Sequence, residues 1–156
     1  MTETKARHSK DMGWLTIQDV LPGKAGELRK VLEKLPDLLE NEEGLLFKIG
    51  TIHYFKWGLI NNDTQLLFVS FFDGSIEQYV DDFFDFYAAN PEVPPPPSFG
   101  VGWPGLESRE GLLKFYQSIM VKDLVTFSDY PDVTVKEVRK ALSLRKAVQD
   151  MLDLSQ

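Results

Sequence analysis

The sequence predicts an α+β fold in which an antiparallel sheet carries helices on one face. Two observations support this prediction. Segment 50–87 alternates like a strand, contains a turn signal, alternates again, and then repeats its apolar residues at helical spacing. A strand pattern and a helix pattern precede this segment, and a helix, a short strand and a final helix follow it. The predicted core order is therefore strand, helix, strand, strand, helix, strand, with extra helices.

The first strand and the first helix are predicted in the N-terminal quarter of the chain. Residues 14–20 alternate in the way that is typical of a strand. An apolar stripe at helical spacing predicts a helix over 25–39. Pro22 suits the first turn of this helix, and Pro36 is expected to kink or interrupt it near its end.

A hairpin and a second helix are predicted next. Apolar and aromatic residues over 45–60 predict the second strand, and residues 65–72 predict the third. Between them, the sequence Asn-Asn-Asp at 61–63 predicts a tight turn, because Asn and Asp tolerate left-handed conformations. Ser75 has capping-box spacing to Gln78, at the start of a helix expected to run to Tyr87.

The C-terminal third begins with a proline-rich stretch at 91–105. We interpret it as an ordered ornament crossing the domain, with an extended polyproline conformation at 94–97. A helix is predicted over 108–118 and a short strand over 122–127. Thr134 and Glu137 have capping-box spacing before an amphipathic last helix.

Composition limits the classes of protein and of partner. A chain of 156 residues, 43% of them hydrophobic, suits one domain, which we expect over 13–156 after a flexible polar tail at 1–12. The net charge of -7 disfavours nucleic acid and anionic membrane surfaces, because both are bound mainly through Lys and Arg. The chain has no cysteine, and no signal peptide or membrane-spanning run is predicted, so we expect a cytoplasmic protein.

The predicted element order is that of a ferredoxin-like fold. Such a sheet has helices on one face only, so its other face needs a cover. We expect a homodimer through this open face, which would also create a shared cavity. The eleven Phe, five Tyr and three Trp suit such an interface, and they also suit a well-filled core.

Three segments resemble a family of uncharacterised bacterial proteins: GTIHYFKWGLI, LLFVSFFDGSIEQYVDDFF and FSDYPDVTVKEVRKALSLRKAV. The predicted fold order resembles the dimeric α+β-barrel superfamily, which includes cofactor-free monooxygenases, chlorite dismutases and dye-decolourising peroxidases. The last two groups hold haem through an axial histidine, so the resemblance implies haem as a candidate cofactor. It transfers no catalytic residue, since neither His53 nor His8 aligns to that ligand.

His53 is the candidate catalytic residue. If residues 51–57 alternate without interruption, one face of the strand carries Thr51, His53, Phe55 and Trp57, and the other carries Ile52, Tyr54 and Lys56. An imidazole titrates near neutral pH and can act as a general base or as a haem ligand. The alternative is a structural histidine at the sheet or dimer surface.

The candidate ligand-binding residues combine two tryptophans, one cation and three polar side chains: Trp57, Trp103, Lys56, Thr16, Gln18 and Ser70. Apolar walls with a few polar groups are typical of small-molecule sites. Lys56 would meet an anionic group of the ligand, and its alternative role is that of an edge-strand lysine that discourages aggregation.

Charged clusters receive simpler interpretations. Asp81 and Asp85 share a helix face, but no second ligand set accompanies them, so no metal site is predicted. Asp73 is expected to cap the helix that begins just after it. The basic side chains of the last helix are expected on a solvated face, or against an acidic partner.

The sequence therefore favours a protein that binds a small apolar or aromatic ligand in a cavity on the open sheet face. Two alternatives stay open. One is an oxidoreductase, either haem-dependent or a cofactor-free monooxygenase, that uses His53. The other is a protein-interaction module without pocket chemistry. A ligand-sized cavity beside His53 would favour the first two hypotheses, and a filled interior would favour the third.

Overall fold

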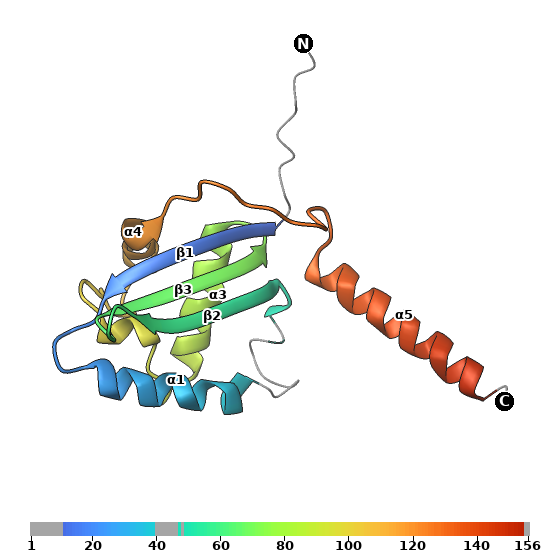
Figure 1. Cartoon of the computed structure of the whole chain (residues 1–156), viewed down its shortest axis with the longest axis horizontal. Helices are drawn as coiled ribbons and strands as arrows, with labels where there is room; N and C mark the ends of the chain where they lie inside the picture. Colours follow the sequence, from blue (N-terminus) through green and yellow to red (C-terminus); the bar gives the residue numbers. More distant parts are fainter. Residues whose placement is uncertain (1–10, 40–46, 48, 155–156) are drawn as a thin grey trace, which may run out of the picture.

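The computed structural model describes residues 11–39, 47 and 49–154. Its centre is a four-stranded antiparallel sheet with the order β2-β3-β1-β4 (Figure 1). The strands are β1 (Asp11–Asp19), β2 (Ile52–Ile60), β3 (Gln65–Asp73) and β4 (Met120–Val121). Because β3 is antiparallel to both of its neighbours, β1 and β2 run in the same direction on either side of it.

Helices lie behind and beside the sheet. Their bounds are α1 (Ala25–Leu39), α3 (Ile76–Ala89), α4 (Arg109–Ile119) and α5 (Val135–Asp153), and a 3-10 turn, η1 (Pro96–Phe99), precedes α4. In Figure 1, α3 lies behind the sheet, whereas the face of the sheet toward the viewer has no helix over it. The protein is therefore an α+β domain with one covered and one open sheet face.

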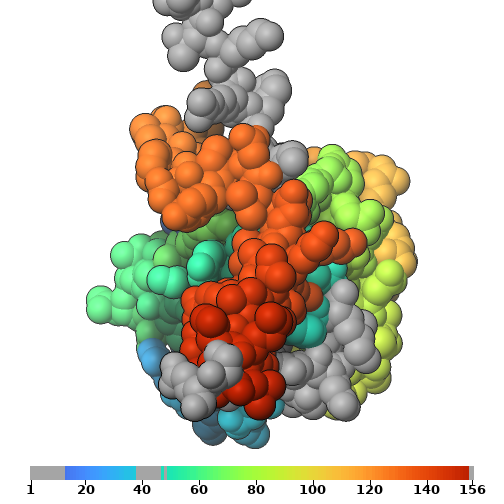
Figure 2. Space-filling model, turned by 90° about the vertical axis from the view of Figure 1, so that its right-hand side faces the viewer, coloured from blue at the N-terminus to red at the C-terminus, as the bar shows by residue number. Residues whose placement is uncertain are grey.

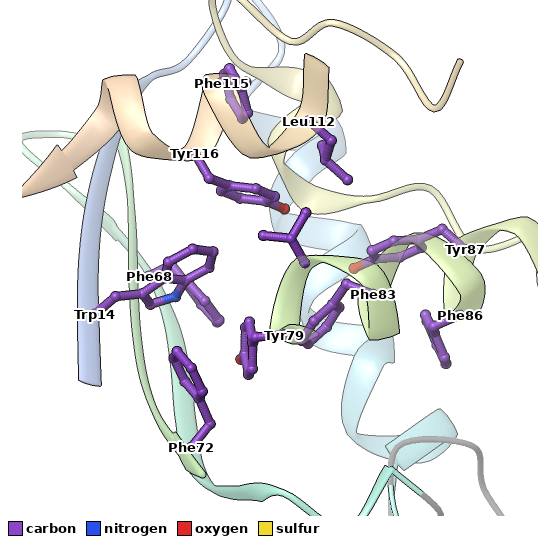
Figure 3. Close-up of a cluster of buried hydrophobic side chains, with 11 residues drawn as sticks. Trp14, Phe68, Phe72, Tyr79, Phe83, Phe86, Tyr87, Leu112, Phe115 and Tyr116 are labelled. Carbon is purple, nitrogen blue, oxygen red and sulfur yellow. The ribbon is translucent and has the colours of Figure 1, made fainter. Parts of the chain in front are cut away.

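The core lies between the covered face and the helices α3 and α4 (Figure 3). Side chains alternate along a strand, so Trp14, Phe68 and Phe72 all point to this side. The helices contribute further aromatic and aliphatic side chains: Tyr79, Val80, Phe83, Phe86, Tyr87, Leu112, Phe115 and Tyr116. No member of this cluster is more than 8% exposed, so much of the aromatic surface fills the core.

The opposite side of the sheet is the open face. Cross-strand pairing places three rows on it: Gly13–Phe71–Tyr54, Leu15–Val69–Lys56 and Ile17–Leu67–Gly58. Tyr54 is 73% exposed, and the Leu, Ile and Val side chains of these rows are half-buried. The open face is thus largely apolar, and Lys56 is its charged side chain within the three rows.

The turn and the helix caps confirm several local predictions. Asn61, Asn62 and Asp63 all have positive φ, as the hairpin signal requires. Ser75 accepts a hydrogen bond from the Gln78 N–H at the start of α3. The predicted capping box is formed at the start of α5, where its two side chains each accept from the other residue's backbone N–H.

Other local predictions are wrong. Residues 122–127 form no strand, and the fourth strand is only Met120–Val121, because pairing with β1 is confined to these two residues. Pro22 lies in a turn before α1 and not in its first turn. Pro36 does not interrupt α1, which continues to Leu39, and a kink at Pro36 stays a prediction. Within the proline-rich stretch, the extended conformation ends at η1, where Pro96 and Pro97 are buried.

The second strand is shorter than expected. It begins at Ile52, whereas Phe47 and Ile49, inside the predicted strand, are helical. Residues 45, 46 and 48 of that prediction lie outside the described residues, as do residues 1–10 of the predicted tail. The last two residues of that tail, Asp11 and Met12, already belong to β1.

The C-terminal helix leaves the domain. Figure 1 shows α5 running away from the end of the sheet, and in Figure 2 its red surface lies in front of the body of the molecule. Val135 is its one buried residue. The segment before it is also apolar and exposed, with Leu124 91% and Val125 89% exposed. Among the described residues, no helix combines the length and apolar character needed to cross a membrane.

Candidate functional site

His53 lies at an irregularity in the pairing of β2 with β3. Ile52 pairs with Phe72 and Tyr54 pairs with Phe71, so the register of the pairing shifts at the residue between them. Such a bulge shifts the alternation by one residue. Ile52 therefore packs against the core together with Phe55, and the predicted grouping of Ile52 with Tyr54 and Lys56 is wrong.

The imidazole of His53 contacts a carboxylate that also holds α5. Its Nε2 atom lies 2.7 Å from Oδ1 of Asp73, and Oδ2 of Asp73 accepts the Val135 N–H at 2.8 Å. Val135 is the first residue of α5, so a carboxylate here stabilises the positive end of that helix. Asp73 was expected to cap α3. That expectation is wrong, because Ser75 caps α3 and Asp73 binds α5.

An imidazole beside a carboxylate can accept and transfer a proton, which is the chemistry of a general base. Here both side chains are partly buried, 15% and 13% exposed, and one carboxylate oxygen is occupied by a backbone N–H. The contacts support the structural alternative for His53, in which it orients Asp73 and Asp73 holds α5.

The interior next to the sheet is filled. A hollow of about 10 Å³ lies among Trp14, Trp57, Phe68, Tyr79, Val80, Phe83 and Tyr116. A space of that size holds one water molecule at most. The indole Nε1 of Trp14 has no hydrogen-bond partner in the structure, so a water here would find one donor to bind. A ligand of aromatic size does not fit.

A short chain of hydrogen bonds crosses this interior. The Oγ atom of Ser70 donates to the Tyr54 carbonyl at 3.2 Å, and Tyr79 OH donates to the same Oγ at 2.6 Å. Burial raises the pKa of Tyr79 above the ordinary tyrosine value, although this hydrogen bond acts in the opposite direction. Burial likewise raises the pKa of Tyr87 and of Tyr116. These phenols stay neutral and contribute to stability.

Gln18 joins the proline-rich stretch to β1. Its Nε2 atom donates to the carbonyls of Pro97 and Val101, at 3.0 Å each. Gly100 packs directly on the carboxamide, where a Cβ atom would lie 2.2 Å from the Gln18 Cδ atom. Gln18 is buried, and its Oε1 atom has no partner. These contacts hold the proline-rich stretch against β1.

The structure separates the other candidate ligand-binding residues. Thr16, Trp57 and Ser70 lie on the covered face, where Trp57 stacks on Phe68 at 4.1 Å between ring centroids. Lys56 lies on the open face. Trp103 packs edge-on against Phe115 beyond η1, at 5.5 Å between ring centroids. These residues therefore do not converge on one cavity with His53.

A second hollow lies between α1 and the outer strand β2. It has a volume of about 220 Å³ and is lined by Arg29, Leu32, Glu33, Trp57, Gly58 and Leu59. Arg29 pairs there with Asp63 of the hairpin, at 2.6 Å. Of the residues predicted to bind a ligand, only Trp57 lines this hollow.

The described residues do not fit haem, the cofactor implied by the resemblance. An axial imidazole must face a space that holds the macrocycle. The Nε2 atom of His53 is bound to Asp73, and His53 lines neither the core hollow nor the hollow beside α1. His8 lies outside the described residues.

The acidic residues of α3 have a structural partner. Arg109, at the start of α4, forms an ion pair with Asp85 and a second one with Asp81 at 3.4 Å. The guanidinium also lies 4.5 Å from the centre of the Phe84 ring. These charges fasten α4 to α3.

The remaining candidate is the open face itself. Its three apolar rows were not identified from the sequence, although the alternation of apolar side chains along β1 and β3 could have predicted them. Large apolar surfaces on a single chain are commonly covered by a partner. No family model, curated protein or solved structure matches this chain. The function is therefore inferred from the open face and from α5.

Proposed function

We propose that the protein is a ferredoxin-like homodimer, and that it acts as a protein-interaction module through its open face. The observation that carries this proposal is the apolar character of the open face, together with an interior too full for a ligand. Helices lie on one side of the sheet, so its other side is open to a partner.

Burial supports the same conclusion. The apolar rows lie on neighbouring strands and form one continuous, half-buried surface, rather than scattered single residues. The rim carries charge, as at Lys56 on the outer strand. An apolar centre with a polar rim is the usual anatomy of a protein interface.

The test is the molar mass in solution of the wild type and of a variant with lysine at the centre of the open face. Val69 pairs with Leu15 on one side and with Lys56 on the other, so it lies in the middle row. We expect the wild type to have about twice the chain mass of 17.8 kDa by size-exclusion chromatography with light scattering at micromolar concentration. Val69→Lys is expected to give a monomer, because a flexible lysine reaches solvent in the single chain but not in an interface.

Val101→Lys is the matched control. Val101 is 51% exposed in the turn after η1 and lies outside the three rows of the open face, so the same substitution there should leave the dimer intact. Far-UV circular dichroism checks that both variants keep the fold. A monomeric wild type, or a Val69→Lys variant that remains a dimer, would overturn the proposal.

A second candidate function rests on the aromatic and cationic side chains of the outer strand. Tyr54 and Lys56 lie two residues apart on the open face, and Tyr54 pairs with Phe71. These groups suit a small aromatic anion. Titration with 8-anilinonaphthalene-1-sulfonate tests this: Lys56→Gln should weaken binding several-fold, and Lys30→Gln on α1 should not. Equal binding by both variants would exclude this role for Lys56.

A further inference from the structure

The apolar side of α5 is exposed in the part of the chain that the structure describes. Val138, Leu142, Leu144, Val148 and Met151 lie on a helix whose only buried residue is Val135, and Met151 is 71% exposed. These residues recur at intervals of two to four along 14 positions, which gives the helix one broad apolar side. A helix with this pattern normally packs against another element.

Contacts at its first turns direct α5 away from its own sheet. Asp73 accepts the Val135 N–H, and Arg139 donates to the Phe47 carbonyl at 3.0 Å. The Arg139 guanidinium also lies 3.9 Å from the centre of the Phe47 ring. While these contacts hold, the helix runs outward, as Figure 1 shows, and cannot fold back over the open face of its own chain.

The open face has the dimensions of such a helix. The 19 residues of α5 span about 28 Å at roughly 1.5 Å per residue. The nine residues of β3, the central strand of the open face, span about 30 Å at roughly 3.3 Å per residue. A helix that lies along β3 would also cover the open-face side chains of β1 and β2, because neighbouring strands are only about 4.8 Å apart.

Charge favours a second copy of this chain as the site where α5 docks. The helix carries five Lys and Arg against three Asp and Glu, whereas the rest of the chain carries twelve against twenty-one. A basic helix is therefore attracted to the acidic body of another copy.

We propose that α5 of one copy lies along the open face of a second copy, and that the second copy returns the same contact. This inference rests on the proposed homodimer and names what covers its open face. The apolar side of α5 around Leu142 and Val148 would pack on the partner's rows around Val69.

Disulfide trapping tests the contact directly, because the chain has no cysteine of its own. Two single variants, Leu142→Cys and Val69→Cys, are co-expressed with tags of different mass and exposed to a mild oxidant. We expect a covalent heterodimer that joins the peptide containing position 142 to the peptide containing position 69. The control pair, Leu142→Cys with Val101→Cys, should yield no such species.

The outcomes separate this inference from the proposed function. Cross-links between two Val69→Cys chains, without the mixed species, would mean that the sheets face each other directly; the homodimer would stand and the arm exchange would fall. A double variant that closes its disulfide within one chain would also overturn the exchange. A wild type that is monomeric would overturn both.

A matched pair of charge variants gives a second, independent readout. Leu142→Asp changes the apolar side of α5, whereas Ser143→Asp adds the same charge one residue away, on its polar side. We expect Leu142→Asp to raise the dimer dissociation constant at least roughly tenfold and Ser143→Asp to leave it nearly unchanged. Equal effects of the two variants would contradict the proposed orientation of the helix.

Discussion

Replacing Gly100 by alanine is expected to destabilise the protein strongly, although the backbone accepts the change. Gly100 has φ -113° and ψ 165°, an extended conformation that any residue adopts. The obstacle is the Gln18 carboxamide, since an added Cβ would lie 2.2 Å from Cδ and 2.3 Å from Nε2. Contacts this short do not occur, so Gln18 has to move.

The size of the effect follows from what Gln18 holds. Its Nε2 atom donates to the carbonyls of Pro97 and Val101, and moving it breaks both bonds. Each bond contributes about 1 kcal/mol. The Val101 carbonyl loses its donor, which adds a penalty of similar size, whereas the Pro97 carbonyl still accepts the Gly100 N–H. Together with the cost of overpacking, we expect a loss of about 3 kcal/mol for Gly100→Ala. At roughly 3 °C per kcal/mol, the melting temperature would fall by about 9 °C.

The assay is urea unfolding followed by circular dichroism, carried out as a double-mutant cycle. In a Gln18→Ala background the clash is absent, so Gly100→Ala should then cost less than about 1 kcal/mol. Gly26→Ala is the control, because Gly26 lies in α1 with nothing within 4 Å of an added Cβ. It should raise stability by about 0.5–1 kcal/mol, as expected for alanine in a helix. Additive effects of Gln18→Ala and Gly100→Ala would refute this reasoning.

Two further predictions concern the tyrosines and the start of α5. The free energy of unfolding should be constant just below pH 10 and fall above it. The reason is that a raised pKa keeps the phenols neutral in the folded protein, whereas the same phenols ionise in the unfolded chain. The fall should approach about 1.4 kcal/mol per pH unit for each buried tyrosine in urea titrations, and a flat profile from pH 10 to 11 would contradict it. The tyrosines are Tyr79, Tyr87 and Tyr116. Asp73→Asn should weaken the contact with Val135 by about 1 kcal/mol, which hydrogen exchange would record as roughly fivefold faster exchange in the first turn of α5. Unchanged exchange there, or an equal change with Glu92→Gln, would contradict this role of Asp73.

Short-range signals in the sequence predicted the hairpin turn and the helix caps correctly, because these features depend on residues that are close together in the chain. The hairpin at 61–63 follows from the tolerance of Asn and Asp for positive φ, and the caps at Ser75 and Thr134 follow from spacing alone. The strand predicted over 122–127 is not formed. The prediction rested on the strand propensity of its apolar residues, but pairing with β1 ends at Val121.

The candidate site depended on contacts between distant residues, which spacing does not reveal. The bulge at His53 depends on how β2 registers with β3, and alternation assumes an unbroken register. The bond from Asp73 to Val135 spans 62 positions, and that from Gln18 to Pro97 spans 79. The predicted ligand residues Thr16 and Ser70 were polar residues in apolar strands, and the structure places them on the covered face.

The distribution of apolar side chains links the fold to assembly. The aromatic residues of the core fill the space between the sheet and the helices, which leaves a hollow of about 10 Å³. Recognition by this chain is therefore expected at its surface. Among the described residues, apolar surface remains on the open face and on the apolar side of α5, and the anchors of α5 at Asp73 and Phe47 keep these two surfaces apart within one chain. Two surfaces that match in length, and that cannot meet within one molecule, can both be covered when two copies meet.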